Sequence, residues 1–81
     1  MTAIGTTSMA NADSQYGLGI GANSGVQSTG DYANYIGSYA GYNSTGNHSV
    51  YVGYYTAKNA IGSDNVFIGR DSGYEVNGNE N

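Results

Sequence analysis

The stretch NVFIG, Asn65–Gly69, has near-copies at regular intervals upstream in the chain. The copies are SVYVG at Ser49–Gly53, ANYIG at Ala33–Gly37 and GLGIG at Gly17–Gly21. An apolar residue followed by glycine thus returns every sixteen residues, with no insertion or deletion. Self-similarity at a fixed period indicates a repeat architecture, in which each repeat packs on its neighbours.

Aligned at this period, the chain forms columns of like residues. The aliphatic column contains Ile4, Ile20, Ile36, Val52 and Ile68. Glycine follows this column directly and returns nine residues later, which gives the turn glycines Gly21, Gly37, Gly53, Gly69, Gly30, Gly46, Gly62 and Gly78. We expect a turn at each of these positions, because glycine adopts positive φ without steric cost.

The residues that lead into the aliphatic column indicate a strand in each repeat. Val50 and Val52 alternate with an aromatic residue, and β-branched and aromatic residues favour strands. Alternation at a period of two predicts one buried face, which the aliphatic residues would form. The opposite face would carry a ladder of stacked rings from Tyr35, Tyr51 and Phe67.

Each repeat is expected to be one coil of strand, turn, shorter strand and turn, with the shorter strand at positions such as Gly41–Ser44. An antiparallel meander would not need identical columns. Stacked coils do need them, because each coil lies ~4.8 Å above the last and like residues meet. Recurrent glycine disfavours helix. The sequence predicts an all-β parallel β-solenoid (β-roll) of about five 16-residue coils, with residues 1–81 as a single domain.

The composition limits how much surface one chain can bury. The 81 residues include 14 glycines and no cysteine, proline or tryptophan. A chain of this size has a marginal core, disulfides cannot reinforce it, and glycine adds to the entropy lost on folding. We therefore expect an obligate homo-oligomer, with the aliphatic column lining either the core or an axis between chains.

The charge balance disfavours several kinds of partner. The net charge is −4 and the two basic residues are Lys58 and Arg70, so the chain lacks the basic patch that nucleic acid requires. No apolar run is long enough to span a membrane, and the first residues lack the layout of a signal peptide. We expect no nucleic acid partner, no membrane insertion and no export by the general secretory route.

The repeat also resembles a known family. One unit reads Tyr35-Ile36-Gly37, Ala40-Gly41 and Thr45-Gly46, and another reads Val66-Phe67-Ile68-Gly69 with Ser72-Gly73. Nearly the whole chain thereby resembles the head-type repeats of trimeric autotransporter adhesins and related bacteriophage tail-fibre repeats, although its period is slightly longer and its tyrosine content higher than in the adhesins. The resemblance implies an extracellular homotrimer, in a virion tail fibre or on a bacterial surface, with the apolar strands facing a threefold axis.

No catalytic or metal site is predicted. His48 has no cysteine or second histidine to complete a metal site and is interpreted as a solvated turn residue. The carboxylates match neither the EF-hand nor the acidic nonapeptide calcium repeat, which leaves an ion on the threefold axis as an open alternative. The motif GRDSG at Gly69–Gly73 is similar to a serine-nucleophile loop but lies on a repeat turn without a histidine partner. We expect no enzyme activity and no cofactor.

Tyrosine is in excess, with nine residues. Aromatic rings suit the C–H groups of sugars, and the candidate glycan-contact residues are Tyr39, Tyr42, Tyr54 and Tyr55. Stacking between coils or packing between chains is the favoured interpretation of the tyrosines. The chain is thus expected to be a structural segment of a longer fibre that supports attachment to a host or surface. A module that binds a cell-surface glycan, and a filament subunit whose ends stack, remain as alternatives.

Overall fold

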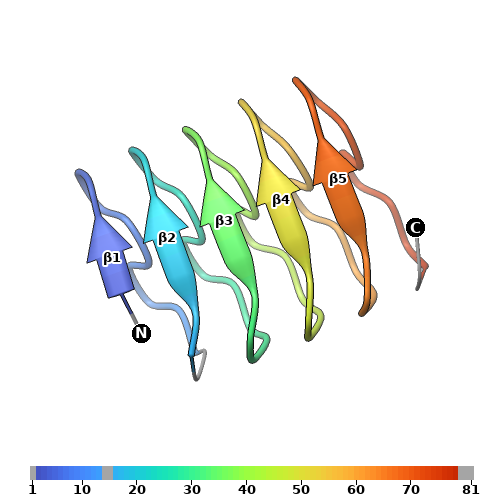
Figure 1. The fold of residues 1–81 in the computed structure, drawn as a ribbon, viewed down its shortest axis with the longest axis horizontal. Coiled ribbons are helices and arrows are strands. Elements are labelled where there is room, and N and C mark those ends of the chain that lie inside the picture. The colour runs from blue at the N-terminus through green and yellow to red at the C-terminus, as the bar shows by residue number, and fades with distance from the viewer. Residues whose placement is uncertain (1, 14–15, 79–81) are drawn as a thin grey trace.

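The computed structural model describes residues 2–13 and 16–78, which form five parallel strands in one sheet (Figure 1). The strands are β1 (Thr2–Ile4), β2 (Leu18–Ile20), β3 (Asn34–Ile36), β4 (Val50–Val52) and β5 (Val66–Ile68). They lie side by side in chain order, and the whole is a β-solenoid of about four turns that measures 27 × 24 × 14 Å. The predicted fold class is confirmed.

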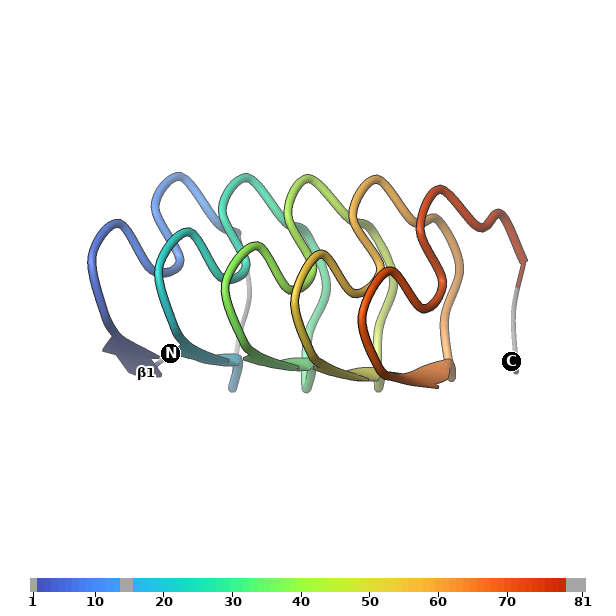
Figure 2. The same ribbon diagram turned by 90° about the horizontal axis from the view of Figure 1, so that it is seen from above.

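Residues sixteen positions apart pair along the whole sheet. Tyr35 pairs with Tyr51, and Tyr51 pairs with Phe67, in parallel register. A second row of single parallel bridges joins Asp13, Thr29, Thr45, Ile61 and Asn77. As a result of this pairing, the strands run along one side of the solenoid and the turns of successive coils lie in phase on the other (Figure 2).

The core is a column of inward-facing strand residues. Tyr35, Tyr51 and Phe67 are buried, and their rings stack with centroid distances of 5.5 and 5.4 Å. They pack against small buried residues of the segments between the strands. In β2 the equivalent position is Gly19, which has no side chain, and Met9 fills the space that a ring would occupy. A Cβ on Gly19 would lie 2.6 Å from Met9 Cγ. Large and small residues on facing walls therefore fill the interior.

The aliphatic column lies on the outer face of the sheet and not in the core of the chain. The middle residue of β4, Tyr51, points inward, so Val50 and Val52 on either side of it point outward. Ile4 and Ile68 are 56% and 68% exposed. The expectation that the aliphatic residues form the buried face does not hold for the single chain, because the aromatic residues occupy the interior. Placement on an axis between chains stays a prediction.

The shorter second strand expected at Gly41–Ser44 is a turn segment instead. Tyr39 and Gly41 have φ of 63° and 67°, in the left-handed region, and this conformation recurs in every coil. The left-handed residues direct their N–H groups alternately toward the preceding coil and the following coil. Tyr39 N donates to Ala22 O at 3.0 Å, and Gly41 N donates to Thr56 O at 2.7 Å. The coils are therefore hydrogen-bonded here without an extended backbone.

The turn glycines lie at the corners of the coils. Positive φ is found at Gly21, Gly37, Gly53, Gly69, Gly30, Gly46 and Gly62, whereas Gly78, at the end of the described range, is outside this set. At Gly37, φ is 125°, and a Cβ there would lie 2.5 Å from the carbonyl oxygen of Gly53 in the next coil. Glycine is needed at this corner both for its backbone conformation and for the close approach of the coils.

Buried polar groups inside the coils are partly satisfied by the turn backbone. The hydroxyls of Ser28 and Ser44 donate to carbonyls three residues earlier, at 2.7 and 2.8 Å. The phenol hydroxyls of Tyr35 and Tyr51 are buried without a well-formed hydrogen bond to any described residue. Burial raises the pKa of both phenols, because the phenolate would lose its hydration.

Candidate binding surface

Three columns of the turn segment that follows each strand form the candidate binding surface. They hold Thr6, Ala22, Ser38, Tyr54 and Arg70; Thr7, Asn23, Tyr39, Tyr55 and Asp71; and Ala10, Val26, Tyr42, Lys58 and Tyr74. The large polar and aromatic side chains are confined to the last three coils. We define the tyrosine face as Tyr39, Tyr42, Tyr54, Tyr55, Lys58, Arg70, Asp71 and Tyr74.

The tyrosine rings contact one another along and across the coils. Tyr39 and Tyr55 stack with centroids 4.8 Å apart and an interplanar angle of 12°. Tyr54 packs against Tyr55 at 4.3 Å with nearly perpendicular rings, and Tyr42 is tilted against Tyr39 at 5.4 Å. A hydrogen bond with Tyr55 raises the pKa of the Tyr54 phenol. The four tyrosines singled out in the sequence thus form one cluster.

Both basic residues of the chain, Lys58 and Arg70, lie on the tyrosine face. Lys58 Nζ is 5.1 Å from the ring centroid of Tyr55 and 5.6 Å from that of Tyr42. The ring centroid of Tyr74, on the next coil, is 6.0 Å away. Three rings therefore surround one ammonium group at distances where the π-electrons attract a cation. The arrangement holds the positive charge at the surface of the aromatic cluster.

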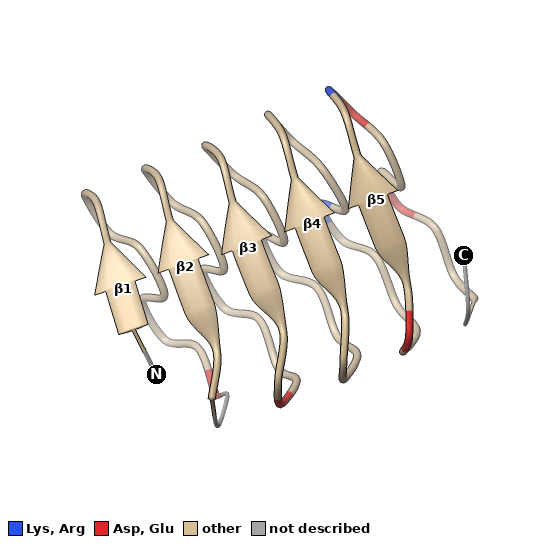
Figure 3. Cartoon of the chain, viewed as in Figure 1, with Lys and Arg blue, Asp and Glu red and all other residues tan. Residues whose placement is uncertain are grey.

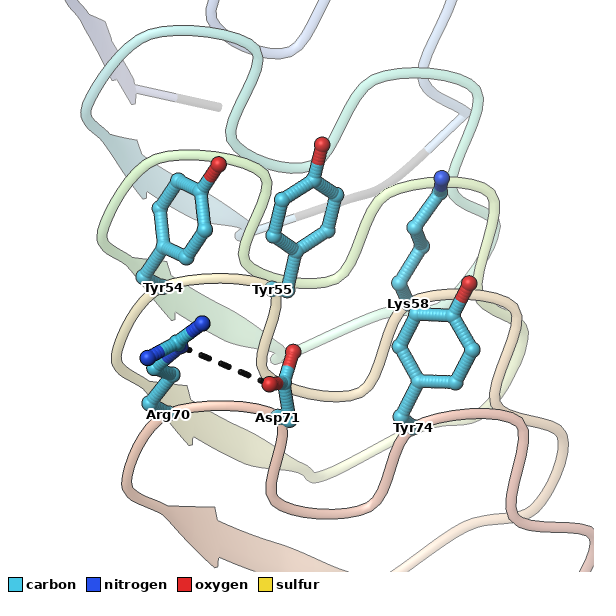
Figure 4. Close-up of a pocket in the computed structure, with 6 residues that line it drawn as sticks. All are labelled: Tyr54, Tyr55, Lys58, Arg70, Asp71 and Tyr74. Carbon is cyan, nitrogen blue, oxygen red and sulfur yellow. Dashed lines mark ion pairs between the residues drawn. The ribbon is translucent and has the colours of Figure 1, made fainter.

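A shallow depression of about 580 Å³ lies between two adjacent coils of the tyrosine face (Figure 4). Its lining consists of Tyr54, Tyr55, Lys58, Arg70, Asp71 and Tyr74. Figure 4 shows the side chains of both coils projecting in the same direction. Arg70 Nε is 3.5 Å from Asp71 Oδ2, and these side chains are 80% and 52% exposed. A pair this exposed contributes little to stability. The depression offers ring surfaces, phenol hydroxyls and cationic donors to a ligand.

The sequence analysis did not propose four residues of this surface as ligand contacts, namely Lys58, Arg70, Asp71 and Tyr74. The signal for them was present in the repeat itself. Arg70 follows Tyr54 by sixteen residues, and Tyr74 follows Lys58 by the same interval. Because like positions of adjacent coils are neighbours in space, extending the tyrosine columns to the last coil would have found all four.

A second aromatic ladder lies at the turn before each strand. Tyr16 and Tyr32 stack at 5.0 Å, and Tyr32 and His48 stack at 5.3 Å. His48 Nδ1 is 3.7 Å from Asp64 Oδ1, with both side chains more than half exposed. His48 is thus an exposed turn residue within a stacked column. Residues 2–13 and 16–78 contain no cluster of three or more histidine, cysteine or acidic side chains that could hold a metal ion.

The outer side of the sheet forms an aliphatic face. We define it by the outward-facing aliphatic residues of the strands, which are Ile4, Leu18, Ile20, Ile36, Val50, Val52, Val66 and Ile68. Figure 3 shows the acidic and basic residues in the connecting segments and none on β1 to β5. Parallel sheets are normally covered on both faces, whereas the outer face of this sheet is uncovered in the single chain.

Comparisons of the chain with protein-family models, with curated proteins and with solved structures returned no match. Among the described residues there is also no helix with the length and apolar character needed to cross a membrane.

Proposed function

We propose that the chain is a structural segment of an extracellular homotrimeric fibre, such as a phage tail fibre or a bacterial surface adhesin, that supports attachment to a host or surface. The observation that supports this proposal most strongly is the aliphatic face, which is apolar, free of charge and uncovered. Contiguous apolar surface of this kind marks an interaction site. Its burial against other copies would contribute ~25 cal/mol for each Å² removed from water.

The geometry of the coils suits a fibre. Coils stack along one direction, so each added repeat lengthens the molecule without changing its cross-section. Isoleucine or valine holds one outward position in all five strands, and Leu18, Val50 and Val66 hold the other in β2, β4 and β5, where β1 and β3 have Thr2 and Asn34. These residues form a straight strip along the stack. Three such strips around an axis parallel to the stack would bury the outer face of every strand, and closed rotational symmetry would limit further lateral association. The resemblance to trimeric fibre repeats favours three copies. The proposed role is mechanical rather than catalytic.

Sedimentation equilibrium tests the proposal. The wild-type chain is expected to have three times the 8.4 kDa mass of one copy. Ile36→Asp, at the centre of the aliphatic face, would bury three carboxylates near the axis and should abolish the trimer. The matched control is Thr45→Asp, because Thr45 is exposed and Asp13 occupies the equivalent position of the first coil.

Circular dichroism would show whether each variant keeps its β-structure. A folded wild-type chain with the mass of one copy would contradict the proposal. So would an Ile36→Asp variant with the full mass of three copies.

A further inference from the structure

We propose that the tyrosine face binds a saccharide that carries a carboxylate group. This inference goes beyond the structural role of the fibre and depends on different residues. The tyrosine face is built on the turn segments, whereas the aliphatic face is built on the strands (Figure 2). A trimer closed through the strands would therefore leave the tyrosine face available to a ligand.

The exposure of two rings points to a ligand. Stacking of Tyr39 on Tyr55 continues a ladder between coils and is accounted for by stability alone. Tyr54 and Tyr74, in contrast, remain 47% and 42% exposed, and both line the depression. The electron-rich faces of such rings attract the C–H groups of a sugar, and their hydroxyls form hydrogen bonds with sugar hydroxyls. A concave surface that combines aromatic rings with a few convergent polar groups suits a small ligand.

The two cations that line the depression indicate which kind of sugar it would bind. The chain has a net charge of −4, yet both of its basic side chains line the same depression. Lys58 is held among three rings and Arg70 reaches toward the same space from the next coil (Figure 4). A site for a neutral sugar would need neither cation. Ammonium and guanidinium groups form charge-assisted hydrogen bonds with a carboxylate, which are about twice as strong as neutral ones.

The acidic residue in the depression adds to the selectivity for a sugar. Asp71 lies beside Arg70, and its carboxylate can accept hydrogen bonds from sugar hydroxyls. The same carboxylate, with the negative charge of the whole chain, would repel a polyanion such as nucleic acid. Aromatic rings, hydroxyl acceptors and two cations together fit a ligand that is mostly hydroxylated and carries isolated carboxylates.

Isothermal titration calorimetry of the assembled wild-type protein tests this inference. The probes are a short oligosaccharide that carries a single galacturonate among neutral residues and the neutral oligosaccharide made from it by reduction of that carboxyl group. The acidic probe is expected to bind at least about tenfold more tightly than the neutral one at low salt, and the difference should shrink as salt is added. This comparison requires no variant and therefore does not depend on the folding of one.

Three substitutions locate the site. Lys58→Gln should remove most of the preference for the acidic probe, and Tyr54→Ala should weaken binding of both probes by about tenfold. The control is Tyr32→Asn, because Tyr32 is an exposed, stacked tyrosine outside the tyrosine face and asparagine tolerates its left-handed backbone. Binding by this variant should equal that of the wild type.

Three results would overturn the inference. They are binding of neither probe, equal affinity for both probes, and a Tyr32→Asn variant that loses as much affinity as Tyr54→Ala. The fibre proposal is judged separately, by the mass of the assembly. A trimer that binds no sugar would therefore refute this inference and leave the structural role standing.

Discussion

Replacing Gly37 with alanine probes the contact between stacked coils. Gly37 has a φ of 125°, and a Cβ there would lie 2.5 Å from the carbonyl oxygen of Gly53 and 2.8 Å from its carbonyl carbon. Both atoms belong to the backbone of the next coil, which cannot rotate away as a side chain could. The matched control is Gly69→Ala. Gly69 has the same φ, but the nearest atom to its added methyl would be Ser72 Cβ at 4.0 Å.

The magnitudes follow from this difference. A non-glycine residue in such a backbone conformation costs of order 1–3 kcal/mol, and this cost is common to both substitutions. Forcing an extra methyl group into a packed contact adds about 1–3 kcal/mol, and this cost applies at Gly37 alone. Gly69→Ala should thus lower the free energy of unfolding by about 1–3 kcal/mol and Gly37→Ala by about 2–6 kcal/mol.

Urea unfolding followed by circular dichroism measures both values. The variants must be compared at one protein concentration, because association makes the unfolding midpoint depend on it. If Gly37→Ala and Gly69→Ala lowered the free energy of unfolding by the same amount, the backbone of the next coil would not lie over Gly37. The reasoning from stacked corners would then be refuted.

The remaining predictions concern the buried phenols. Tyr51→Phe should change the free energy of unfolding by no more than about 1 kcal/mol, because the hydroxyl that it removes is buried beside Ser49 and Asn65 without a well-formed hydrogen bond; a larger loss in urea unfolding would contradict this. Tyr51→Ala should lower it by about 3–5 kcal/mol, because a cavity would open between the flanking rings. Above pH 10.0, the unfolded phenols ionise while buried Tyr35 and Tyr51 keep their protons, so the unfolding free energy should fall as the pH rises. In unfolding curves recorded from pH 8 to 11, the variant with both Tyr35→Phe and Tyr51→Phe should lose less stability than the wild type, and equal losses would show that these phenols do not cause the alkaline sensitivity.

The stacking register was predictable from the sequence because like residues recur at a fixed interval of sixteen. Isoleucine or valine followed by glycine holds its place in all five repeats, and a slip of one residue at any repeat would misplace the turn. The pairings Val50 with Val66 and Val52 with Ile68 are those that the repeat predicts. Length, period and glycine spacing therefore determined the coil and the parallel order of the strands.

The direction in which each strand faces was not determined by the same pattern. Val50, Tyr51 and Val52 are all large and apolar, so the alternation shows two faces without showing which of them is inside. The small residues that face the strands across the interior determine which strand face is inside, because Gly41 and Gly73 leave room for the aromatic rings. A Cβ at Gly41 would lie 2.2 Å from Tyr35, and a Cβ at Gly73 would lie 2.3 Å from Phe67.

The turn segment and the full tyrosine face escaped the sequence analysis for a related reason. Left-handed residues such as Tyr55 and Asn59 are not glycine, and nothing in their type demands that backbone conformation. Lys58 and Tyr74 meet only because adjacent coils stack. This contact depends on the stacking of residues sixteen positions apart and not on the local sequence, so an analysis of each segment by itself could not find it.

The most direct test of the stacked coils is a nuclear Overhauser spectrum of isotope-labelled protein, with contacts between copies filtered out. The account predicts cross-strand contacts in parallel order, Val50 with Val66 and Val52 with Ile68. Contacts in reversed order, Val50 with Ile68 and Val52 with Val66, would show an antiparallel sheet and would contradict the solenoid.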